Sequence, residues 1–280
     1  MVDHPSTNAR CNILAVIEEP ETTRQCLIGA AASAAMVPPL GTVTALHIEV
    51  DPAKIRTAPE EISIQQLREQ YEGSAHDRAI QIQRIFEFWL TANPSISAQW
   101  RKIIGTVDAN VTQQAQGADL IVLGQPHNLD SADALHAAIF HSGKPVLFLP
   151  RGPLRDITFD HLAVAWKDTP QANKAIRQTQ PWLAAATRLS VLTVDEPGTT
   201  RNTGSVEQWM REHDLPFELQ HLTCPPNGHA ATALLAAAEQ IEADALVMGA
   251  YRFGQILEWV FGGVTSEILQ RSTFPVFLAH

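Results

Sequence analysis

The sequence predicts an α/β protein of two doubly wound domains, each built on a five-stranded parallel sheet of the Rossmann-like type. Buried-type apolar runs recur along the chain, and alanine-rich segments with helical spacing separate them. The whole pattern also occurs twice. The repeat is visible in three pairs of segments: NILAVIEEPE (12–21) with HLAVAWKDTP (161–170), GADLIVLGQ (117–125) with EADALVMGA (242–250), and KPVLFLP (144–150) with FPVFLAH (274–280).

These segments and the runs between them give each half about five strands. The expected strands lie within 12–21, 43–50, 98–105, 117–125 and 144–150 in the first half, and within 161–170, 189–197, 217–224, 242–250 and 274–280 in the second. The segments 12–21 and 161–170 each contain a strand followed by a turn. Apolar residues three and four apart predict the helices between them. The expected helices are 22–36, 60–90, 109–116, 172–186, 205–213, 230–241 and 264–270.

A polar segment with glycine and proline, RGPLRDITFD (151–160), separates the two copies. We therefore place the domain boundary at about 155, with a first domain over 1–155 and a second over 156–280. The last strands of the copies, PVLFL and PVFLA, would each leave a sheet edge unpaired. Pairing them with each other would satisfy both edges.

Composition restricts the class of function. The 280 residues are 45% hydrophobic and carry a formal net charge of −10. No basic face is available for nucleic acid or an anionic membrane surface. Three widely spaced cysteines without a C-x-x-C pair, no signal-like start and no long apolar run predict a soluble cytoplasmic protein.

The candidate ligand site is the glycine-containing loop MGAYRFGQILEWVFGGVT (248–265), which follows a predicted strand. Gly249 ends that strand, and Gly262 and Gly263 would let the backbone approach an anion at the start of a helix. Neither G-x-x-x-x-G-K-[ST] nor G-x-G-x-x-G is present. The two standard phosphate-binding motifs are therefore excluded.

In its repeated segments and its glycine-containing loop, the chain resembles a tandem universal stress protein. The domains of that family carry G-x2-G-x9-G-[ST] before a final helix and strand. The resemblance covers both halves and implies an adenine nucleotide α-hydrolase-like fold, with the two domains paired as an internal pseudo-dimer and a further homodimer of chains. Gly249 and Gly262 match the first and third glycines of the motif. Arg252 replaces the second glycine, and Gly263 replaces the hydroxyl residue.

The resemblance also implies a ligand, ATP or AMP, and roles for single residues in the second domain. Met248 and Val194 would flank the base, and Thr265 with the backbone of residues 262–264 would hold the phosphates. The aspartate that ends the first strand in the family aligns with Lys167, one residue before Asp168. A guanidinium at Arg252 could also grip phosphate.

The first half is not expected to bind nucleotide. Alignment on Pro145 and Pro275 places Ala132 and Asp133 opposite the two glycines, and the preceding segment is five residues shorter. Asp133 is expected to cap its own helix and take the place of an anion. Like charges would repel a triphosphate from the turn after the first strand, which carries Glu18, Glu19 and Glu21.

Other roles are also open to single residues and to the whole chain. Asp168 is expected to cap the helix near Pro170, with ligand contact as the competing role. His136 and His141 lie five apart and would not share a helix face, so no metal site is expected. The function that the resemblance implies is that of a non-catalytic stress-response protein for binding or signalling, with an adenine nucleotide in the second domain. The alternatives are a weak nucleotide hydrolase and a nucleotide-independent scaffold for a protein or lipid partner.

Overall fold

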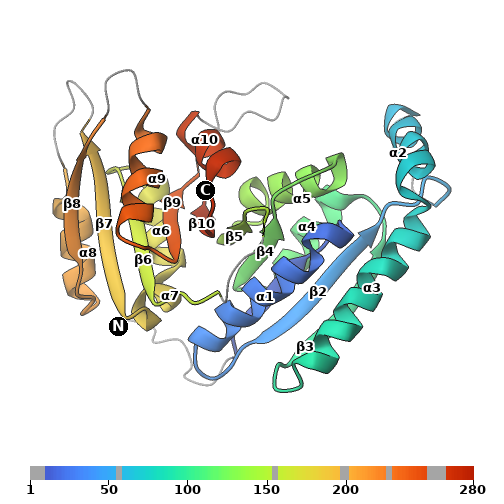
Figure 1. Cartoon of the computed structure of the whole chain (residues 1–280), viewed down its shortest axis with the longest axis horizontal. Helices are drawn as coiled ribbons and strands as arrows, with labels where there is room; N and C mark the ends of the chain where they lie inside the picture. Colours follow the sequence, from blue (N-terminus) through green and yellow to red (C-terminus); the bar gives the residue numbers. More distant parts are fainter. Residues whose placement is uncertain (1–9, 55–58, 153–156, 196–201, 225–228, 251–262) are drawn as a thin grey trace. The chain divides into compact units, whose positions relative to one another are not determined.

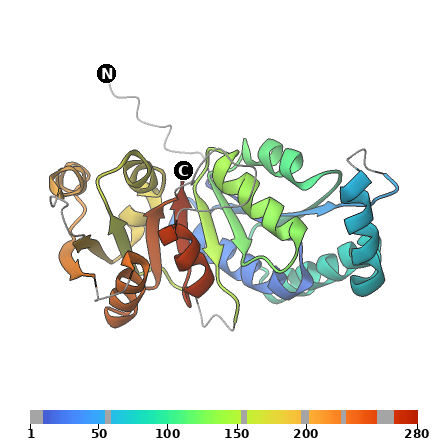
Figure 2. The same ribbon diagram turned by 90° about the horizontal axis from the view of Figure 1, so that it is seen from above.

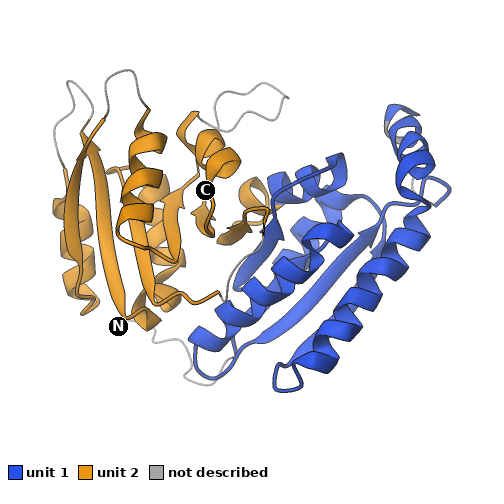
Figure 3. Ribbon diagram, in the orientation of Figure 1, with its two compact units in different colours: residues 1–137 blue, residues 138–280 orange. Residues whose placement is uncertain are grey.

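The chain consists of two compact units, residues 1–137 and 138–280, in a computed structural model (Figure 3). The structure describes residues 10–54, 59–152, 157–195, 202–224, 229–250 and 263–280. The division falls earlier than the boundary at about 155 that the repeat suggests. The reason is that the last strand of the first copy pairs within the second unit.

The first unit contains the elements of the first copy up to the middle of its last helix (Figure 1). Its strands are β1 (Asn12–Val16), β2 (Thr42–Glu49), β3 (Ala98–Ile104) and β4 (Leu120–Gly124). Its helices are α1 (Pro20–Met36), α2 (Pro59–Glu72), α3 (Ala75–Ala92), α4 (Val107–Ala115) and α5 (Leu129–Phe140), which extends across the division.

The second unit repeats this alternation and adds the last strand of the first copy. Its strands are β5 (Val146–Leu149), β6 (His161–Trp166), β7 (Arg188–Asp195), β8 (Glu218–Thr223), β9 (Ala245–Gly249) and β10 (Val276–Ala279). Its helices are α6 (Pro170–Gln178), α7 (Gln180–Ala185), α8 (Gly204–Glu212), α9 (Ala230–Gln240) and α10 (Gly263–Arg271).

The sheet order is that of a doubly wound fold in both units. The first unit has the order β3-β2-β1-β4, and the second has β5-β10-β9-β6-β7-β8. All pairs are parallel except β5 with β10. Helices cover both faces of the strands in each unit (Figure 2), which explains why the central strands read as continuous apolar runs. The predicted α/β class is confirmed.

Each of the ten strand positions expected from the sequence contains a strand. Two of the expected helices, 60–90 and 172–186, are each divided into two helices in the structure. The helix expected at 60–90 ends at Glu72, because Gly73 has φ of 80° and Ser74 caps α3 by accepting the Asp77 N–H at 3.1 Å. The helix expected at 172–186 breaks at Thr179, which follows the end of α6 and precedes α7, where Pro181 lies in the first turn.

The last strands of the two copies pair with each other, as the sequence suggested. β5 and β10 are antiparallel, with Phe148 opposite Val276 and Val146 opposite Leu278. Both strands are completely buried. β10 therefore has a strand on each side, β9 and β5, and neither of its edges is exposed.

Within the described residues, no helix is long and apolar enough to cross a membrane.

The cores of both units consist of aliphatic and aromatic side chains. In the second unit, Phe277 of β10 packs against Phe159 and Trp182, with ring centroids 5.4 and 6.0 Å apart. All three side chains are almost fully buried, as expected for anchors of a packed core.

Candidate functional site

The second unit has its topological switch between β9 and β6, since the chain goes from β6 to β7 and β8 on one side and returns to β9 on the other. The carboxyl ends of these parallel strands lie at one edge of the sheet, where ligands of doubly wound folds bind. Lys167 and Asp168 follow β6, and Val194 lies near the end of β7. The predicted candidates Met248 and Gly249 end β9.

Two of the predicted site residues, Arg252 and Gly262, lie outside the described residues. Gly263 is the first residue of α10 and is exposed, and Val264 beside it is half-buried. Thr265, the predicted phosphate contact, is fully buried. The structure therefore places the remaining candidates at one edge of the sheet without bringing every predicted contact to the surface.

Asp168 is held by neutral donors from two segments. Its carboxylate accepts hydrogen bonds from Ser205 Oγ at 3.0 Å, from Asn173 Nδ2 at 3.4 Å and from Asn202 Nδ2. It does not cap α6. Thr169 is the N-cap residue, because its Oγ1 accepts the Ala172 N–H at 3.3 Å. The expectation that Asp168 caps this helix is wrong, since the cap lies one residue later.

Gly249 has a packing role that the motif alone does not reveal. A Cβ at this position would lie 2.6 Å from the carbonyl carbon of Gln171 and 2.7 Å from the amide nitrogen of Ala172, in the first turn of α6. Gly124 at the end of β4 is the equivalent residue, and its Cβ would lie 2.7 Å from Cβ of Thr22 in α1. Both glycines let a helix approach the end of a strand closely.

The corresponding crevice of the first unit lies between β1 and β4, and its own carboxylates fill it. Oε1 of Glu19, just after β1, accepts the N–H groups of His127 at 2.7 Å and Asn128 at 3.2 Å, and the hydroxyl of Ser131. These donors surround the N-terminus of α5. An anion from the protein itself therefore occupies the position where a helix N-terminus would hold a phosphate.

Asp133 does not have the capping role expected from the sequence. α5 begins at Leu129, so Asp133 lies in its second turn. Asn128 caps the helix instead, because its Oδ1 accepts the Ser131 N–H at 3.0 Å. The alignment from Pro145 missed this, since α5 is longer than α10 and starts further from its following strand.

Buried charged groups from α2 and α3 close the first crevice further. Arg68 of α2 forms an ion pair with Asp130, and Gln65 Nε2 donates to the same carboxylate at 2.6 Å. Glu18, His47, Arg68, Arg78 and Asp130 line the remaining gap, which leaves no space for a water molecule. Nothing in the sequence pattern of α2 pointed to this, because Gln65 and Arg68 read as residues of a solvated helix face.

Burial changes the titration of the groups in this gap. The pKa of Glu18 is raised well above its ordinary value, chiefly by burial and then by the nearby Asp130 charge. Burial also lowers the pKa of His47 to about 4, although its Nδ1 donates to the Ile17 carbonyl at 2.8 Å. His47 is therefore neutral near pH 7. The carboxyl group of Glu18 holds its proton to higher pH than an exposed glutamate.

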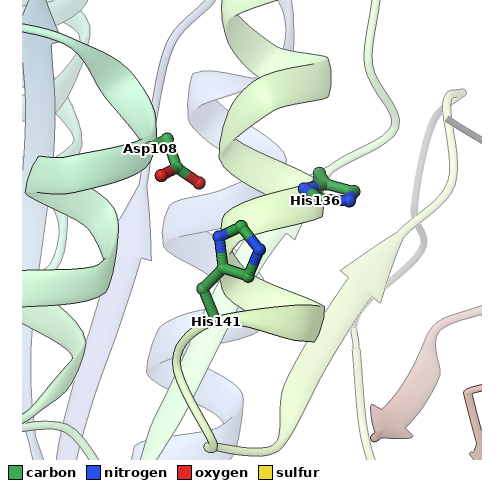
Figure 4. Close-up of side chains that lie close together, drawn as sticks. All are labelled: Asp108, His136 and His141. Atoms are coloured by element: carbon green, nitrogen blue, oxygen red, sulfur yellow. The ribbon is translucent and has the colours of Figure 1, made fainter. Parts of the chain in front are cut away.

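One group of side chains elsewhere has the residue types of a metal site. Asp108 at the start of α4, His136 of α5 and His141 just after α5 each offer a ligand atom, and these atoms lie within 4.8 Å of one another (Figure 4). The helix-face argument against the two histidines does not apply, because α5 ends at Phe140. His141 falls in the second unit and the others in the first, so no site is built on them.

The fold and the crevices define a doubly wound α/β protein made of two related copies. Comparison with known proteins shows what the chain is similar to. The universal stress protein family model matches residues 227–280. No curated protein matches the chain.

Solved structures extend this likeness over nearly the whole chain. A universal stress protein from Archaeoglobus fulgidus DSM 4304 is 16% identical, with a TM-score of 0.62, over 96% of this chain and 97% of that one. A functionally unknown protein from Pseudomonas aeruginosa PAO1 is 15% identical, with a TM-score of 0.58, over 97% and 92%. At these identities the likeness shows the fold. With the family match, the resemblance to the universal stress proteins is confirmed.

A shorter relative is known with a ligand. A universal stress protein in complex with cAMP is 19% identical and matches 43% of this chain and 97% of its own, with a TM-score of 0.31. This likeness is too weak to carry a conclusion about the ligand of the present chain.

Proposed function

We propose that the chain is a non-catalytic stress-response protein of the universal stress type that binds an adenine nucleotide, ATP or AMP, in its second domain. The proposal assigns the base to Met248 and Val194 and the phosphates to Thr265 and the backbone of residues 262–264. Lys167, Asp168, Gly249 and Arg252 complete the site. The first domain, residues 1–155, is structural.

The observation that carries this proposal is the difference between the two helix N-termini. In the first copy, the start of α5 is neutralised by Glu19, and Asp130 lies in the first turn. The first turn of α10 contains no acidic residue. The partial positive charge of a helix N-terminus favours an anion. Of the two termini, that of α10 is the better place for the phosphates of a nucleotide.

The experiment places an internal carboxylate at the start of α10. Gly263 is exposed, and a Cβ there would meet no atom within 4 Å, so a larger side chain fits. Titration calorimetry with ATP, ADP and AMP is expected to show binding to the natural chain, at least tenfold weaker binding to Gly263→Glu, and much less weakening in the uncharged control Gly263→Gln. If the natural chain binds none of the three at high micromolar concentration, the proposed ligand is wrong.

The non-catalytic assignment is supported by the surroundings of Asp168. A nucleotide hydrolase needs a carboxylate free to hold a metal ion or to act as a base. Asp168 is the carboxylate the sequence offered for this, and three donors already engage it. Phosphate release from ATP is therefore expected to equal that of the Gly263→Glu variant. Steady release above that level would favour the weak hydrolase.

The nucleotide-independent scaffold is supported by α2 of the first unit. This helix exposes three large apolar side chains at helical spacing, Ile64, Leu67 and Tyr71. A protein partner would cover them, and a lipid would be the alternative.

We also propose a cytoplasmic location and a homodimer. Sedimentation analysis of the purified chain tests the oligomer, and a monomer at micromolar concentration would contradict it.

A further inference from the structure

Helix α2 is attached to the first unit through polar side chains. Gln65 Nε2 donates to Oδ1 of Asp130 at 2.6 Å, and Arg68 forms an ion pair with the same carboxylate. Gln65 is the only buried residue among the described side chains of α2. These contacts, one helical turn apart, fix which side of the helix faces the protein.

The opposite side of α2 carries an exposed apolar stripe, which consists of Ile64, Leu67 and Tyr71. These side chains are 42%, 55% and 82% exposed, and their spacing of three and four residues places them on one face. The helix lies beyond the carboxyl end of β2, at the margin of its unit (Figure 1). Amphipathic helices normally turn such a stripe toward the core. The orientation of α2 is therefore inverted, and burial of the stripe requires a partner.

The charges beside the stripe restrict the chemistry of that partner. On one flank the exposed residues are neutral, namely Ser63, Gln66 and Gln70. On the other flank, Arg68 is already paired with Asp130. The exposed residues Glu60 and Glu72 belong to the two ends of the helix. Among the described side chains beside the stripe, neither a basic peptide nor an anionic membrane therefore finds the opposite charge that would hold it.

A second copy of this chain fits the stripe better. The chain has a formal net charge of −10, so most approaches of two copies bring like charges together. A contact through the centre of α2 avoids this repulsion, because the stripe and its exposed flank are uncharged. The cores of protein interfaces are likewise depleted in charged residues and enriched in tyrosine.

The spacing of the stripe also makes it self-complementary. In a twofold contact the same surface is used by both partners, so each pair of residues occurs twice. When two α2 helices pack antiparallel with Leu67 on the axis, Ile64 of one copy lies opposite Tyr71 of the other. An aliphatic side chain then meets an aromatic ring on both sides of the axis, while the tyrosine hydroxyl can stay in water at the rim.

We propose that two copies of this chain associate through the α2 stripe, antiparallel and with Leu67 on the twofold axis. This inference rests on the proposed homodimer and names its interface. The helix has 14 residues and is about 21 Å long, so the contact is at the small end of protein interfaces. The dissociation constant is therefore expected in the low micromolar range.

Sedimentation equilibrium of the full chain tests the surface. The natural chain is expected to be mostly dimeric at tens of micromolar. Leu67→Glu places two like charges on the axis, and its dissociation constant is expected to rise at least tenfold. Phe88→Glu in α3 is the matched control, since Phe88 is 80% exposed and lies outside the stripe. Its dissociation constant should equal that of the natural chain. Should Leu67→Glu fail to fold by circular dichroism, Tyr71→Glu takes its place.

Salt distinguishes an apolar contact from one held by ion pairs. Added sodium chloride screens the repulsion between two acidic chains, so it should strengthen association of the natural chain. Weaker association at higher salt would contradict the uncharged surface.

Disulfide formation tests the twofold geometry. Leu67→Cys is expected to form an interchain disulfide under mild oxidation at least tenfold faster than Phe88→Cys, because only a residue near the axis meets its own copy. Equal rates for the two variants, measured against the natural chain with its three cysteines, would refute the antiparallel arrangement.

The outcomes separate this surface from the homodimer itself. A natural chain that is monomeric at tens of micromolar contradicts both. A natural chain that dimerises as strongly as Leu67→Glu refutes the α2 surface and leaves the homodimer in place. Binding of a monomeric natural chain to phosphatidylcholine vesicles, with loss of binding in Leu67→Glu, would assign the stripe to lipid and overturn the proposal.

Discussion

At the scale of single residues, Gly249 shows what a motif does and does not convey. The sequence identified it as the first glycine of a phosphate loop, and the structure gives it a steric role that its counterpart Gly124 shares. Spacing predicts that a small residue is required at this position. It does not predict which atom a Cβ added at this position would meet, because that depends on how a helix packs on the sheet.

This steric role predicts a loss of stability in Gly249→Ala. The added Cβ would overlap the backbone of Gln171 and Ala172, which cannot rotate away, so the free energy of unfolding should fall by about 1–3 kcal/mol. Gly263→Ala is the control, since its Cβ meets no atom within 4 Å and its effect should stay within about 0.5 kcal/mol. Urea unfolding measures both. Equal midpoints for the two variants would refute the packing role.

A second residue-scale prediction concerns acid stability. His47 has a pKa lowered from 6.5 to about 4 in the folded chain, so between these values the unfolded chain binds a proton that the folded chain does not. Stability from this group is therefore lost as the pH falls, by roughly 3 kcal/mol between pH 7 and pH 4. Glu18 acts in the opposite direction, because its raised pKa favours the folded state as pH falls.

The measurement for His47 is therefore a difference between two proteins that both retain Glu18. Urea unfolding of the natural chain and of His47→Gln at pH 7, 5.5 and 4 is expected to show the natural chain losing roughly 3 kcal/mol more than the variant. Parallel losses in the two proteins would show that this imidazole does not titrate in the way its burial requires.

At the scale of elements, strand positions could be predicted from the sequence, and helix ends only in part. Buried parallel strands give continuous apolar runs bounded by polar turns, so each of the ten runs is recognisable. Helix breaks depend on one or two residues, such as Gly73 with its positive φ before the Ser74 cap. The role of α2 was beyond reach, because its contact with Asp130 joins residues 62 apart in the chain.

This contact predicts how α2 is held in place. Arg68 and Asp130 have side chains only 8% and 7% exposed, so removal of one partner leaves a buried charge without compensation. Arg68→Met should therefore destabilise the docking of α2 by about 3–5 kcal/mol, while combining it with Asp130→Leu should recover most of the loss. Hydrogen exchange over residues 59–72 measures the effect, with exposed Arg84→Met as the control. Unchanged exchange in Arg68→Met would mean that the ion pair does not hold the helix.

At the scale of the whole molecule, the internal repeat predicted both the fold class and the pairing of the last strands. The candidate site was predictable only as an edge of the sheet. The filling of the first unit's crevice by Glu19 was not predictable, because Glu19 and the loop at His127 are 108 residues apart and no periodicity relates them. Repeats report which elements recur, whereas the use of a recurring crevice depends on individual side chains that differ between the copies.

The pairing of β5 with β10 makes the position of the domain boundary a measurable property. A fragment of residues 156–280 follows the boundary set by the repeat, but it lacks β5 and exposes one edge of β10. Unpaired apolar edges recruit other strands, so this fragment should self-associate. A fragment of residues 138–280 keeps β5 and should associate less at the same concentration, by light scattering after size exclusion. If both fragments associate equally, β5 does not protect the edge of β10. The boundary at about 155 would then describe the folding unit as well as the division after residue 137 does.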